Sequence, residues 1–355
     1  MDPNAGKKGM FNKRNKQQAL QDLEAENFNR KTVSFYRYVM IPKPNQLRDE
    51  LYEQWNSLDV LGRIYLAQEG INAQLSVPTH NWEAFVSNVN SYTFFEAISF
   101  KTALEEDRKS FFKLTIKVRN QIVADGLRKD EYDVTNVGIH LSAKQWNNAM
   151  RKGATIVDMR NHYESEIGRF EGAICPQVET FQEELPEVKK LLKGKEEESI
   201  LLYCTGGIRC EKASAYLKHN GFLDVNQLHG GIIDYARQLK EDESLLNRFE
   251  GKNFVFDERL GERVSNKIIS NCHQCGGPCD THTNCKNVNC NLLFIQCEKC
   301  KNINKGCCSP ECIKISQMTD EEQAKLRVGI TNKKRYHSHS KLDLSKAFKQ
   351  NEKTN

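Results

Sequence analysis

Residues 199–217 read SILLYCTGGIRCEKASAYL, and this stretch decides the fold. Its first part, residues 199–204, is an unbroken apolar run, which is typical of a parallel strand covered on both faces. Residues 211–219 follow as a helical segment, so we expect a strand, a short loop and a helix. Ligand sites in open α/β sheets gather at the carboxyl ends of the strands. Cys204 therefore lies where an α/β domain places its functional groups.

The loop between this strand and this helix has the chemistry of a reactive thiol. It consists of Cys204, Thr205, Gly206, Gly207, Ile208 and Arg209. The two glycines allow the backbone amides to turn inward and form an anion-binding nest. The helix N-terminus and the Arg209 guanidinium add positive charge, which lowers the pKa of a thiol and makes it nucleophilic at neutral pH. We expect Cys204 to carry a thiolate or a persulfide.

The spacing of cysteine and arginine separates this loop from similar phosphatase loops. Phosphatases place the arginine one residue further along because the loop must encircle a phosphate, whereas Arg209 is the fifth residue after Cys204. The tighter ring favours sulfur chemistry. The alternative is that Cys204 is an inert core thiol, which would leave the glycines and the arginine without a purpose. For Cys210 two roles remain open, namely resolving a persulfide or disulfide on Cys204, or packing beneath the helix.

The surrounding segments predict a doubly wound α/β domain over residues 142–250. Ser142 is expected to cap a helix, and residues 154–160 are expected to form a second buried strand. Residues 225–239 read as a strand, a turn and a helix. Strands that alternate with helices are typical of a parallel sheet with helices on both faces.

This domain resembles the rhodanese family. Beyond the cysteine loop, the resemblance rests on Asp158-Met159-Arg160 with Glu164, on GRFEGAICP at residues 168–176 and on HGGI at residues 229–232. Asp158 and Arg160 are expected to pair and to hold the floor of the loop. Cys175 lies where the chain turns, and we interpret it as structural.

Residues 32–120 show the β-α-β-β-α-β order of a ferredoxin-like or acylphosphatase-like domain. Strands are expected at residues 32–42, 62–68, 73–78 and 111–119. Residues 69–72 are expected to form the turn of a hairpin. The helix after Pro44 presents Leu47, Leu51 and Trp55 on one face, and a helix capped by Thr79 presents Trp82, Phe85 and Val89.

Ten of the thirteen cysteines lie between Cys272 and Cys312. Cys272-x-x-Cys275 and Cys297-x-x-Cys300 are typical of a zinc site, because each pair presents two thiolates to one tetrahedral ion. The other cysteines suffice for a second ion: Cys279, Cys285, Cys290, Cys307, Cys308 and Cys312. We expect segment 270–315 to need metal for folding. An iron–sulfur cluster and free thiols are the alternatives, and His273 or His282 could replace one cysteine.

The composition predicts a soluble, cytoplasmic protein. A chain of 355 residues is too long for one ordinary core and suits two domains plus extensions. Charged residues make up 28%, the mean hydropathy is −0.67, and no run approaches the roughly 20 apolar residues of a membrane-spanning helix. The first residues lack the apolar region of a secretory signal, and clustered cysteines in a reducing compartment indicate metal or thiol chemistry.

The two ends are basic, and residues 121–141 read as a connector. From Lys325 to Asn355 nine Lys or Arg stand against two acids, and the first 31 residues contain seven against four. We interpret residues 1–31 as a polar basic extension and residues 316–355 as a basic tail. Such ends are either solvated chain or contacts for nucleic-acid phosphates.

Residues 32–315 as a whole resemble the bacterial oxygen-dependent tRNA uridine hydroxylases. The resemblance is carried by GRIYLAQEGINAQLSV at 62–77, VDMRNHYESEIGRFEGAI at 157–174, YCTGGIRCEKASAYL at 203–217 and CCSPEC at 307–312. It implies hydroxylation of the wobble uridine of tRNA to 5-hydroxyuridine, with molecular oxygen as co-substrate and the anticodon loop as partner. The essential cysteine of the family corresponds to Cys204. The sequence identifies no electron donor.

Two other functions remain open. One is a sulfurtransferase that carries a persulfide on Cys204, and the other is a non-catalytic RNA-binding zinc protein, against which the intact Cys204 and Arg209 argue. For the hydroxylase we hypothesise that the Cys204 thiolate attacks carbon six of the uracil and activates carbon five toward an oxidant. The wobble base is unpaired in an anticodon loop, so its extrusion costs little compared with flipping from a duplex.

Overall fold

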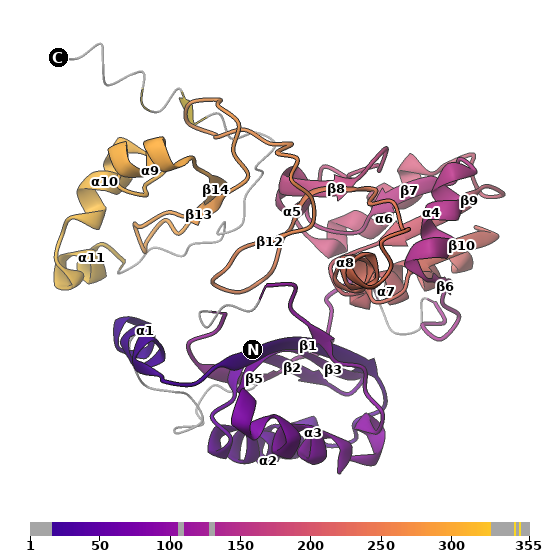
Figure 1. Ribbon diagram of the computed structural model, residues 1–355, viewed down its shortest axis with the longest axis horizontal. Coiled ribbons are helices and arrows are strands. Elements are labelled where there is room, and N and C mark those ends of the chain that lie inside the picture. Colours follow the sequence, from indigo (N-terminus) through magenta and orange to yellow (C-terminus); the bar gives the residue numbers. More distant parts are fainter. Residues whose placement is uncertain (1–15, 106–109, 128–131, 328–343, 346–347, 349–355) are drawn as a thin grey trace.

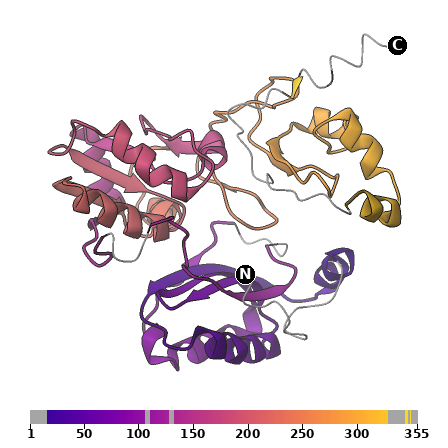
Figure 2. The ribbon, with the colours of Figure 1, turned by 180° about the vertical axis from the view of Figure 1, so that it is seen from behind.

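The computed structural model describes residues 16–105, 110–127, 132–327, 344, 345 and 348. These residues form three units, which Figures 1 and 2 show from opposite sides. The N-terminal sheet lies below the other two units in Figure 1, with the parallel α/β unit and the cysteine-rich module above it. The first fifteen residues and most of the predicted basic tail lie outside the described residues.

The N-terminal unit is a five-stranded sheet whose helices α2 and α3 lie together on one side (Figure 1). Its elements are α1 Lys16–Ala25, β1 Arg30–Tyr38, α2 Pro44–Ser57, β2 Leu61–Ala67, β3 Gly70–Pro78, a 3-10 turn Thr79–Asn81, α3 Trp82–Asn90, a 3-10 turn Thr93–Phe95, β4 Lys101–Thr102 and β5 Leu114–Val118. The strand order is β4-β1-β3-β2-β5. The predicted β-α-β-β-α-β order is confirmed, and β4 is an addition too short for sequence periodicity to reveal.

One face of this sheet forms a core with the two helices, and the other face is left for the rest of the molecule. The predicted helix faces are buried, including Leu51, Trp55 and Phe85. They pack against Val33 and Phe35 of β1. Because side chains alternate across a strand, the even-numbered residues of β1 point away from this core.

Two local expectations in this unit were wrong. The predicted hairpin of β2 and β3 is present, but its turn is residues 68–69 rather than 69–72, because β3 already begins at Gly70, which also lies directly opposite Tyr38 of β1. Gly70 has φ +142°, and a Cβ there would lie 2.0 Å from the Arg37 carbonyl oxygen, so only glycine fits this tight approach. Thr79 does not cap α3, because its hydroxyl donates to the Asn29 carbonyl at 3.1 Å and α3 starts only at Trp82.

The second unit is a doubly wound parallel sheet, as predicted. Its elements are β6 Ile139–Leu141, α4 Ala143–Arg151, β7 Thr155–Asp158, α5 His162–Ile167, β8 Gly168–Phe170, α6 Phe181–Leu191, β9 Ser199–Tyr203, α7 Ile208–His219, β10 Asp224–Leu228 and α8 Gly231–Glu241. The order β6-β10-β9-β7 is parallel throughout. Leu202 of β9 joins the core beneath α6 and α7, and Leu201 joins the core beneath α4 and α8.

The start of this unit was only partly predicted. Ser142 does cap α4, since its side chain accepts from the Gln145 amide and the Gln145 side chain accepts from the Ser142 amide. Strand β6 falls inside the segment expected to be a connector. Its three residues are mostly exposed at the sheet edge, so no apolar run marks them in the sequence.

The third unit follows a small antiparallel sheet that attaches it to the second. Its elements are β11 Phe249–Asn253, β12 Glu262–Arg263, β13 His282–Asn284, β14 Leu293–Ile295, α9 Glu298–Ile303, α10 Pro310–Ser316 and α11 Asp320–Arg327. Strand β11 pairs with β8 of the second unit and with β12. The Asp280 carboxylate joins the module to this sheet through Lys252 at 3.0 Å and Arg263 at 2.6 Å.

The first residues of α8 donate backbone hydrogen bonds to the cysteine loop. The Ile232 amide donates to the Cys204 carbonyl at 3.0 Å, and the Ile233 amide donates to the Thr205 carbonyl at 3.2 Å. This close approach depends on Gly231, where a Cβ would lie 2.5 Å from the Cys204 carbonyl oxygen. The loop backbone is therefore held by α8 as well as by its own helix.

We expect Gly231→Ala to lower the melting temperature more than Gly172→Ala does. The two glycines have similar φ values, +68° and +72°, so left-handed strain of roughly 1–2 kcal/mol applies to both. Gly172 faces open space, whereas Gly231 faces the carbonyls of Cys204 and Thr205. Circular dichroism melts of the two variants measure the difference, and equal shifts would contradict the close contact.

Candidate active site

Cys204 follows the last residue of β9 and has no exposed surface. Its sulfur accepts a hydrogen bond from the Gly207 amide at 3.1 Å. Gly207 has φ +98° and caps α7, so the chain turns through a left-handed residue to aim this amide at the sulfur. The nest predicted from the two glycines is thus present at Gly207.

The surroundings of Cys204 stabilise its thiolate. Burial alone disfavours the charged form, but the Cys210 thiol, the Arg209 charge and the amides of Arg209 and Cys210 outweigh it and lower the pKa of Cys204 to about 6. Burial and the neighbouring Cys204 raise the pKa of Cys210 well above its usual value. Cys210 is therefore the protonated partner that donates to the Cys204 sulfur.

Arg209 is bound by a carboxylate of α5. Its guanidinium donates to both oxygens of Glu164, at 2.7 and 2.9 Å, and both side chains are buried. Thr205 joins this pair, with its hydroxyl 3.3 Å from Glu164 and 3.4 Å from Arg209. Glu164 was part of the rhodanese resemblance but had no assigned role.

Asp158 and Arg160 form the predicted ion pair at the end of β7. The guanidinium donates to both carboxylate oxygens at 2.8 and 2.6 Å, and it also reaches the Gly168 carbonyl. Tyr203, the residue before Cys204, donates to Asp158 at 2.7 Å. Neither charge of the pair is exposed, so the pair fixes the end of β9 rather than facing a substrate.

The N-terminal unit contacts the cysteine loop directly, which the sequence did not predict. Tyr36 donates to Glu211 of α7 at 2.9 Å, and Tyr38 donates to the Ile208 carbonyl at 3.3 Å. A Cβ on Gly207 would lie 2.9 Å from the Tyr36 hydroxyl oxygen, whereas Gly206 faces open space. The alternating Tyr-Arg-Tyr of β1 is the signal that could have shown two polar aromatic side chains on one face of a strand.

The remaining side of Glu211 is occupied by polar groups of the second unit. His140 lies 3.0 Å from one carboxylate oxygen, and Gln227 donates to the other at 3.1 Å. Burial disfavours the charged form of Glu211, but the hydrogen bond and charge of His140 and the hydrogen bonds from Tyr36 and Gln227 outweigh it and lower the pKa of Glu211. The Glu211 pair also raises the pKa of His140.

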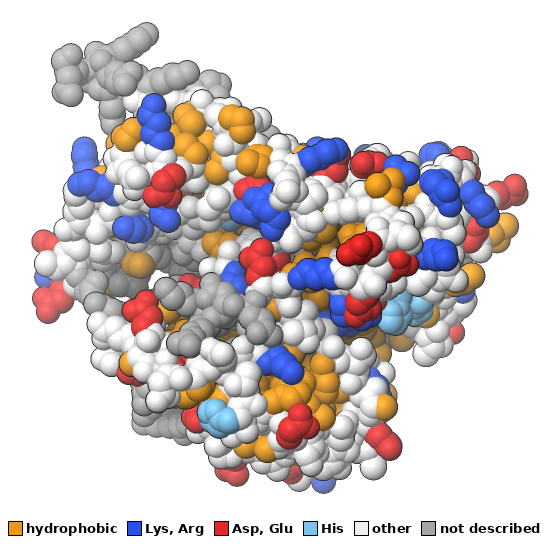
Figure 3. All heavy atoms as spheres, in the orientation of Figure 1, with side chains coloured by type: hydrophobic (Ala, Val, Ile, Leu, Met, Phe, Trp, Pro, Cys, Tyr) orange, Lys and Arg blue, Asp and Glu red, His pale blue; other side chains and the backbone are white. Residues whose placement is uncertain are grey.

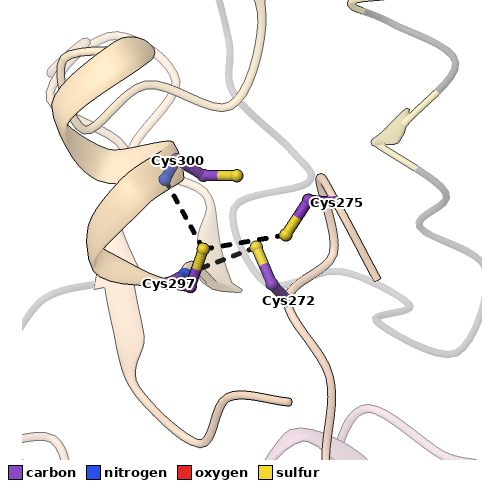
Figure 4. A group of neighbouring side chains, drawn as sticks. All are labelled: Cys272, Cys275, Cys297 and Cys300. Carbon is purple, nitrogen blue, oxygen red and sulfur yellow. Dashed lines mark hydrogen bonds between the residues drawn. The ribbon is translucent and has the colours of Figure 1, made fainter. Parts of the chain in front are cut away.

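The cysteine-rich module holds two groups of four cysteines. One group is Cys272, Cys275, Cys297 and Cys300, whose side chains point toward one another in Figure 4. The other is Cys285, Cys290, Cys308 and Cys312. The sulfur atoms of each group lie within 4.8 Å of one another.

The sulfur spacing fits a tetrahedral ion. The distance is 3.7 Å between the sulfurs of Cys275 and Cys297 and 3.6 Å between those of Cys290 and Cys308. Four thiolates at about 2.3 Å from zinc would lie about 3.8 Å apart. Each group can therefore hold one metal ion.

Four residues of the cysteine-rich module that the sequence offered as metal ligands lie outside both groups of four. The Cys279 sulfur accepts from the Thr281 amide at 3.5 Å, and the Cys307 thiol lies 3.4 Å from the Ser316 hydroxyl. His273 pairs with Glu166 of α5 at 2.8 Å. His282 packs edge-on against a phenylalanine ring at 5.2 Å. Eight of the ten cysteines are thus brought together.

Comparison with known families covers most of the chain. It matches the UPF0176 acylphosphatase like domain over residues 30–122, the rhodanese-like domain over residues 142–238 and the rhodanase C-terminal domain over residues 250–313. A tRNA uridine(34) hydroxylase of Leptospira interrogans is 55% identical and aligns over 90% of this chain and 87% of its own length. The chain belongs to the tRNA uridine(34) hydroxylase family.

The chain is also similar to a second curated relative and to a solved rhodanese-like domain. The tRNA uridine(34) hydroxylase of Salmonella gallinarum is 49% identical over 90% of this chain and 93% of its own length. The rhodanese-like domain of an Anabaena protein is 22% identical, with a TM-score of 0.25, and covers 32% of this chain and 78% of that chain. Within the described part of this tRNA uridine(34) hydroxylase family member, no helix has the length and apolar character to span a membrane.

We expect the thiolate of Cys204 to titrate with a midpoint near pH 6. Because the pKa of Cys204 is about 6, its sulfur is protonated below this pH and charged above it. The measurement is the ultraviolet absorbance of the thiolate against pH, taken as the difference between the wild type and Cys204→Ser. A midpoint at the ordinary cysteine value of about 8.5 would show that the loop does not stabilise the anion.

Proposed function

We propose that this protein hydroxylates the wobble uridine of tRNA at carbon five, giving 5-hydroxyuridine, with molecular oxygen as co-substrate and Cys204 as nucleophile. The observation that carries this proposal is a stabilised thiolate at Cys204 in a chain that aligns along almost its whole length with tRNA uridine(34) hydroxylases. An inert core thiol would have its pKa raised by burial, and the loop lowers it instead.

The first step we propose is addition of the thiolate to the pyrimidine. A lone pair of the Cys204 sulfur forms a bond to carbon six, and the π pair between carbons five and six moves toward the carbon-four carbonyl. Carbon five becomes electron-rich and open to the oxidant. A thiolate with a pKa of about 6 is almost fully ionised at neutral pH and is therefore available for this attack.

The neighbours of Cys204 act, in this proposal, by positioning it. The Gly207 amide and the Cys210 thiol donate to the sulfur, and the pairs at Arg209 and at Asp158 hold the loop and its floor. These positioning residues are Thr205, Gly206, Gly207, Ile208, Arg209, Cys210, Asp158 and Arg160. None of them needs to bond to the substrate for the step above.

The substrate is proposed to be bound by the three units together, with boundaries at residues 32–120, 142–250 and 270–315. The cysteine loop belongs to the second unit, and the first unit supplies Tyr36 and Tyr38 beside it. Figure 3 shows Lys and Arg side chains interspersed with Asp and Glu over the face it presents. On this face we expect separated cations, rather than one basic stripe, to contact the tRNA backbone.

We also propose that each group of four cysteines binds one zinc ion with a structural role. Four thiolates leave no open coordination position, which is typical of structural rather than catalytic zinc. The module has short strands and helices of six to eight residues, so metal binding is expected to supply much of its folding energy.

Nucleoside mass spectrometry of tRNA tests the reaction. In a strain lacking the gene, 5-hydroxyuridine should be lost, and it should return with the wild type and with Cys175→Ser but not with Cys204→Ser. Cys175 is the control because it is a partly buried thiol of the same unit outside the loop. Loss of thiouridine instead would support the sulfurtransferase, and no change in either nucleoside would exclude both activities on tRNA.

Elemental analysis tests the metal assignment. We expect two zinc ions per chain, about one after Cys300→Ala or Cys312→Ala, and two after Cys279→Ala or Cys307→Ala, because only the first pair belongs to the groups of four. Iron with labile sulfide would contradict zinc. Metal loss in the Cys279 or Cys307 variant would contradict the grouping.

A further inference from the structure

Arg209, the cation expected to stabilise the Cys204 thiolate, is already paired with the carboxylate of Glu164. Both arms of the Arg209 guanidinium are bound to Glu164, and the pair is buried. A charge held in this way can stabilise the thiolate in its resting position. It is poorly placed to follow negative charge that leaves the sulfur during a reaction, because moving it would break two buried hydrogen bonds.

The open face of the N-terminal sheet lies against the cysteine loop. Ser34, Tyr36 and Tyr38 alternate along β1 and share the face opposite the helix-covered core. Two of them reach α7, through Glu211 and the Ile208 carbonyl. Residues of both the first and the second unit therefore surround the cysteine loop.

Lys101 of β4 stands on this same face. It is the register partner of Ser34, and directly opposed residues of paired strands point to the same side. Its ammonium lies 4.4 Å from the centre of the Tyr36 ring. Strand β4 also contacts α8, whose first residues support the Cys204 carbonyl.

The charge of Lys101 is held near anions without being paired to one. Among the described residues no carboxylate lies within ion-pair distance of it, and its side chain is partly buried. The anions that act on it are Cys204, Asp234 and Glu211. Burial outweighs their attraction and lowers the pKa of Lys101. An ammonium in this state gains by moving toward any new negative charge at the loop.

We propose that Lys101 is a further catalytic residue, which attracts the Cys204 thiolate electrostatically at rest and hydrogen-bonds the carbon-four oxygen of the pyrimidine as the sulfur adds to carbon six. This inference rests on the proposed function. In the addition, the sulfur lone pair becomes the new S–C bond and the displaced π pair places negative charge on that oxygen. A lysine side chain has a flexible stem and three donors, so it can reorient toward the charge as it develops.

The addition can be observed without any oxidant. The enolate accepts a deuteron from D2O at carbon five, the original proton leaves, and the thiolate is expelled as the double bond reforms. The balance is one hydrogen exchanged for one deuterium, with no change of oxidation state. Anaerobic incubation of tRNA with the full-length protein, followed by nucleoside mass spectrometry, measures this exchange at the wobble uridine.

The variants are Lys101→Met, Lys101→Arg and Lys31→Met. Lys31 is a matched control, since its ammonium also lies 4.4 Å from an aromatic ring, that of Trp82, but on the helix-covered face of the same sheet. We expect exchange at saturating tRNA to fall about 100-fold in Lys101→Met, as when one donor to a developing oxyanion is removed. Lys101→Arg should retain part of the rate, and Lys31→Met should match the wild type.

A second readout does not depend on tRNA. The absorbance titration of Cys204 should shift to higher pH in Lys101→Met, because a cation whose charge acts on the thiolate has been removed, and should stay unchanged in Lys31→Met. If Lys101→Met melts early, this titration is made on Lys101→Gln and Lys101→Arg, which must differ for the proposal to hold.

The outcomes separate this proposal from the proposed function. If Lys101→Met leaves both the exchange rate and the Cys204 titration unchanged, the Lys101 proposal is overturned. It is also overturned if Lys101→Met weakens tRNA binding but exchanges at the wild-type rate at saturating tRNA, because that is how a residue that only contacts a phosphate would behave. A wild type that neither exchanges nor hydroxylates would overturn the proposed function, and with it this inference. Hydroxylation by the wild type without any exchange would overturn this inference and the thiolate addition on which it rests, and would leave the hydroxylation itself in place.

Discussion

The buried pairing of Arg209 with Glu164 is the interaction on which the geometry around Cys204 depends. It ties the first turn of α7 to α5 through two hydrogen bonds, and removing one partner of such a pair typically costs about 3–5 kcal/mol because the other charge stays buried. The neighbouring residues of the same turn extend this arrangement. Glu211 reaches Tyr36, and Lys212 reaches Asp125 at 2.8 Å. One helical turn thus joins three parts of the chain next to Cys204.

The short helix α5 contacts both the cysteine loop and the cysteine-rich module. Glu164 faces the cysteine loop, and Glu166 pairs with His273, which lies between the first two cysteines of one group of four. A six-residue helix is marginal by itself, so its position depends on contacts at both ends. The cysteine-rich module is far from Cys204 in sequence, yet it contacts α5, the helix whose Glu164 holds Arg209. Through this contact the module is connected to the cysteine loop, although its own cysteine groups lie outside that loop.

The sequence predicted the parts of this site that are local and missed those that depend on docking. The order Cys204, Gly207, Arg209 is contiguous, so its strand, turn and helix could be inferred from one stretch. The cysteine pairs Cys272–Cys275 and Cys297–Cys300 could likewise be inferred because metal binding fixes their spacing. The contact of Tyr36 with Glu211 spans 175 positions of sequence, and no propensity or periodicity encodes which faces of two units meet. Strand β4 was not predicted for a different reason, because a strand of two residues is too short to show a periodic pattern of apolar residues.

The cysteine loop alone suits both sulfur transfer and addition to a pyrimidine. Both reactions need a thiolate that is ionised at neutral pH and still nucleophilic, and nucleophilicity falls only partly as the pKa of a thiol is lowered. What differs is where the charge goes. A persulfide keeps its negative charge on the terminal sulfur, close to the loop amides that donate hydrogen bonds there. Addition to a base instead moves the negative charge several atoms away from the Cys204 sulfur. The second case needs a cation outside the loop, and Lys101 of the N-terminal sheet is such a cation, beside the Tyr36 ring. The docked first unit, more than the loop, therefore favours chemistry on a base.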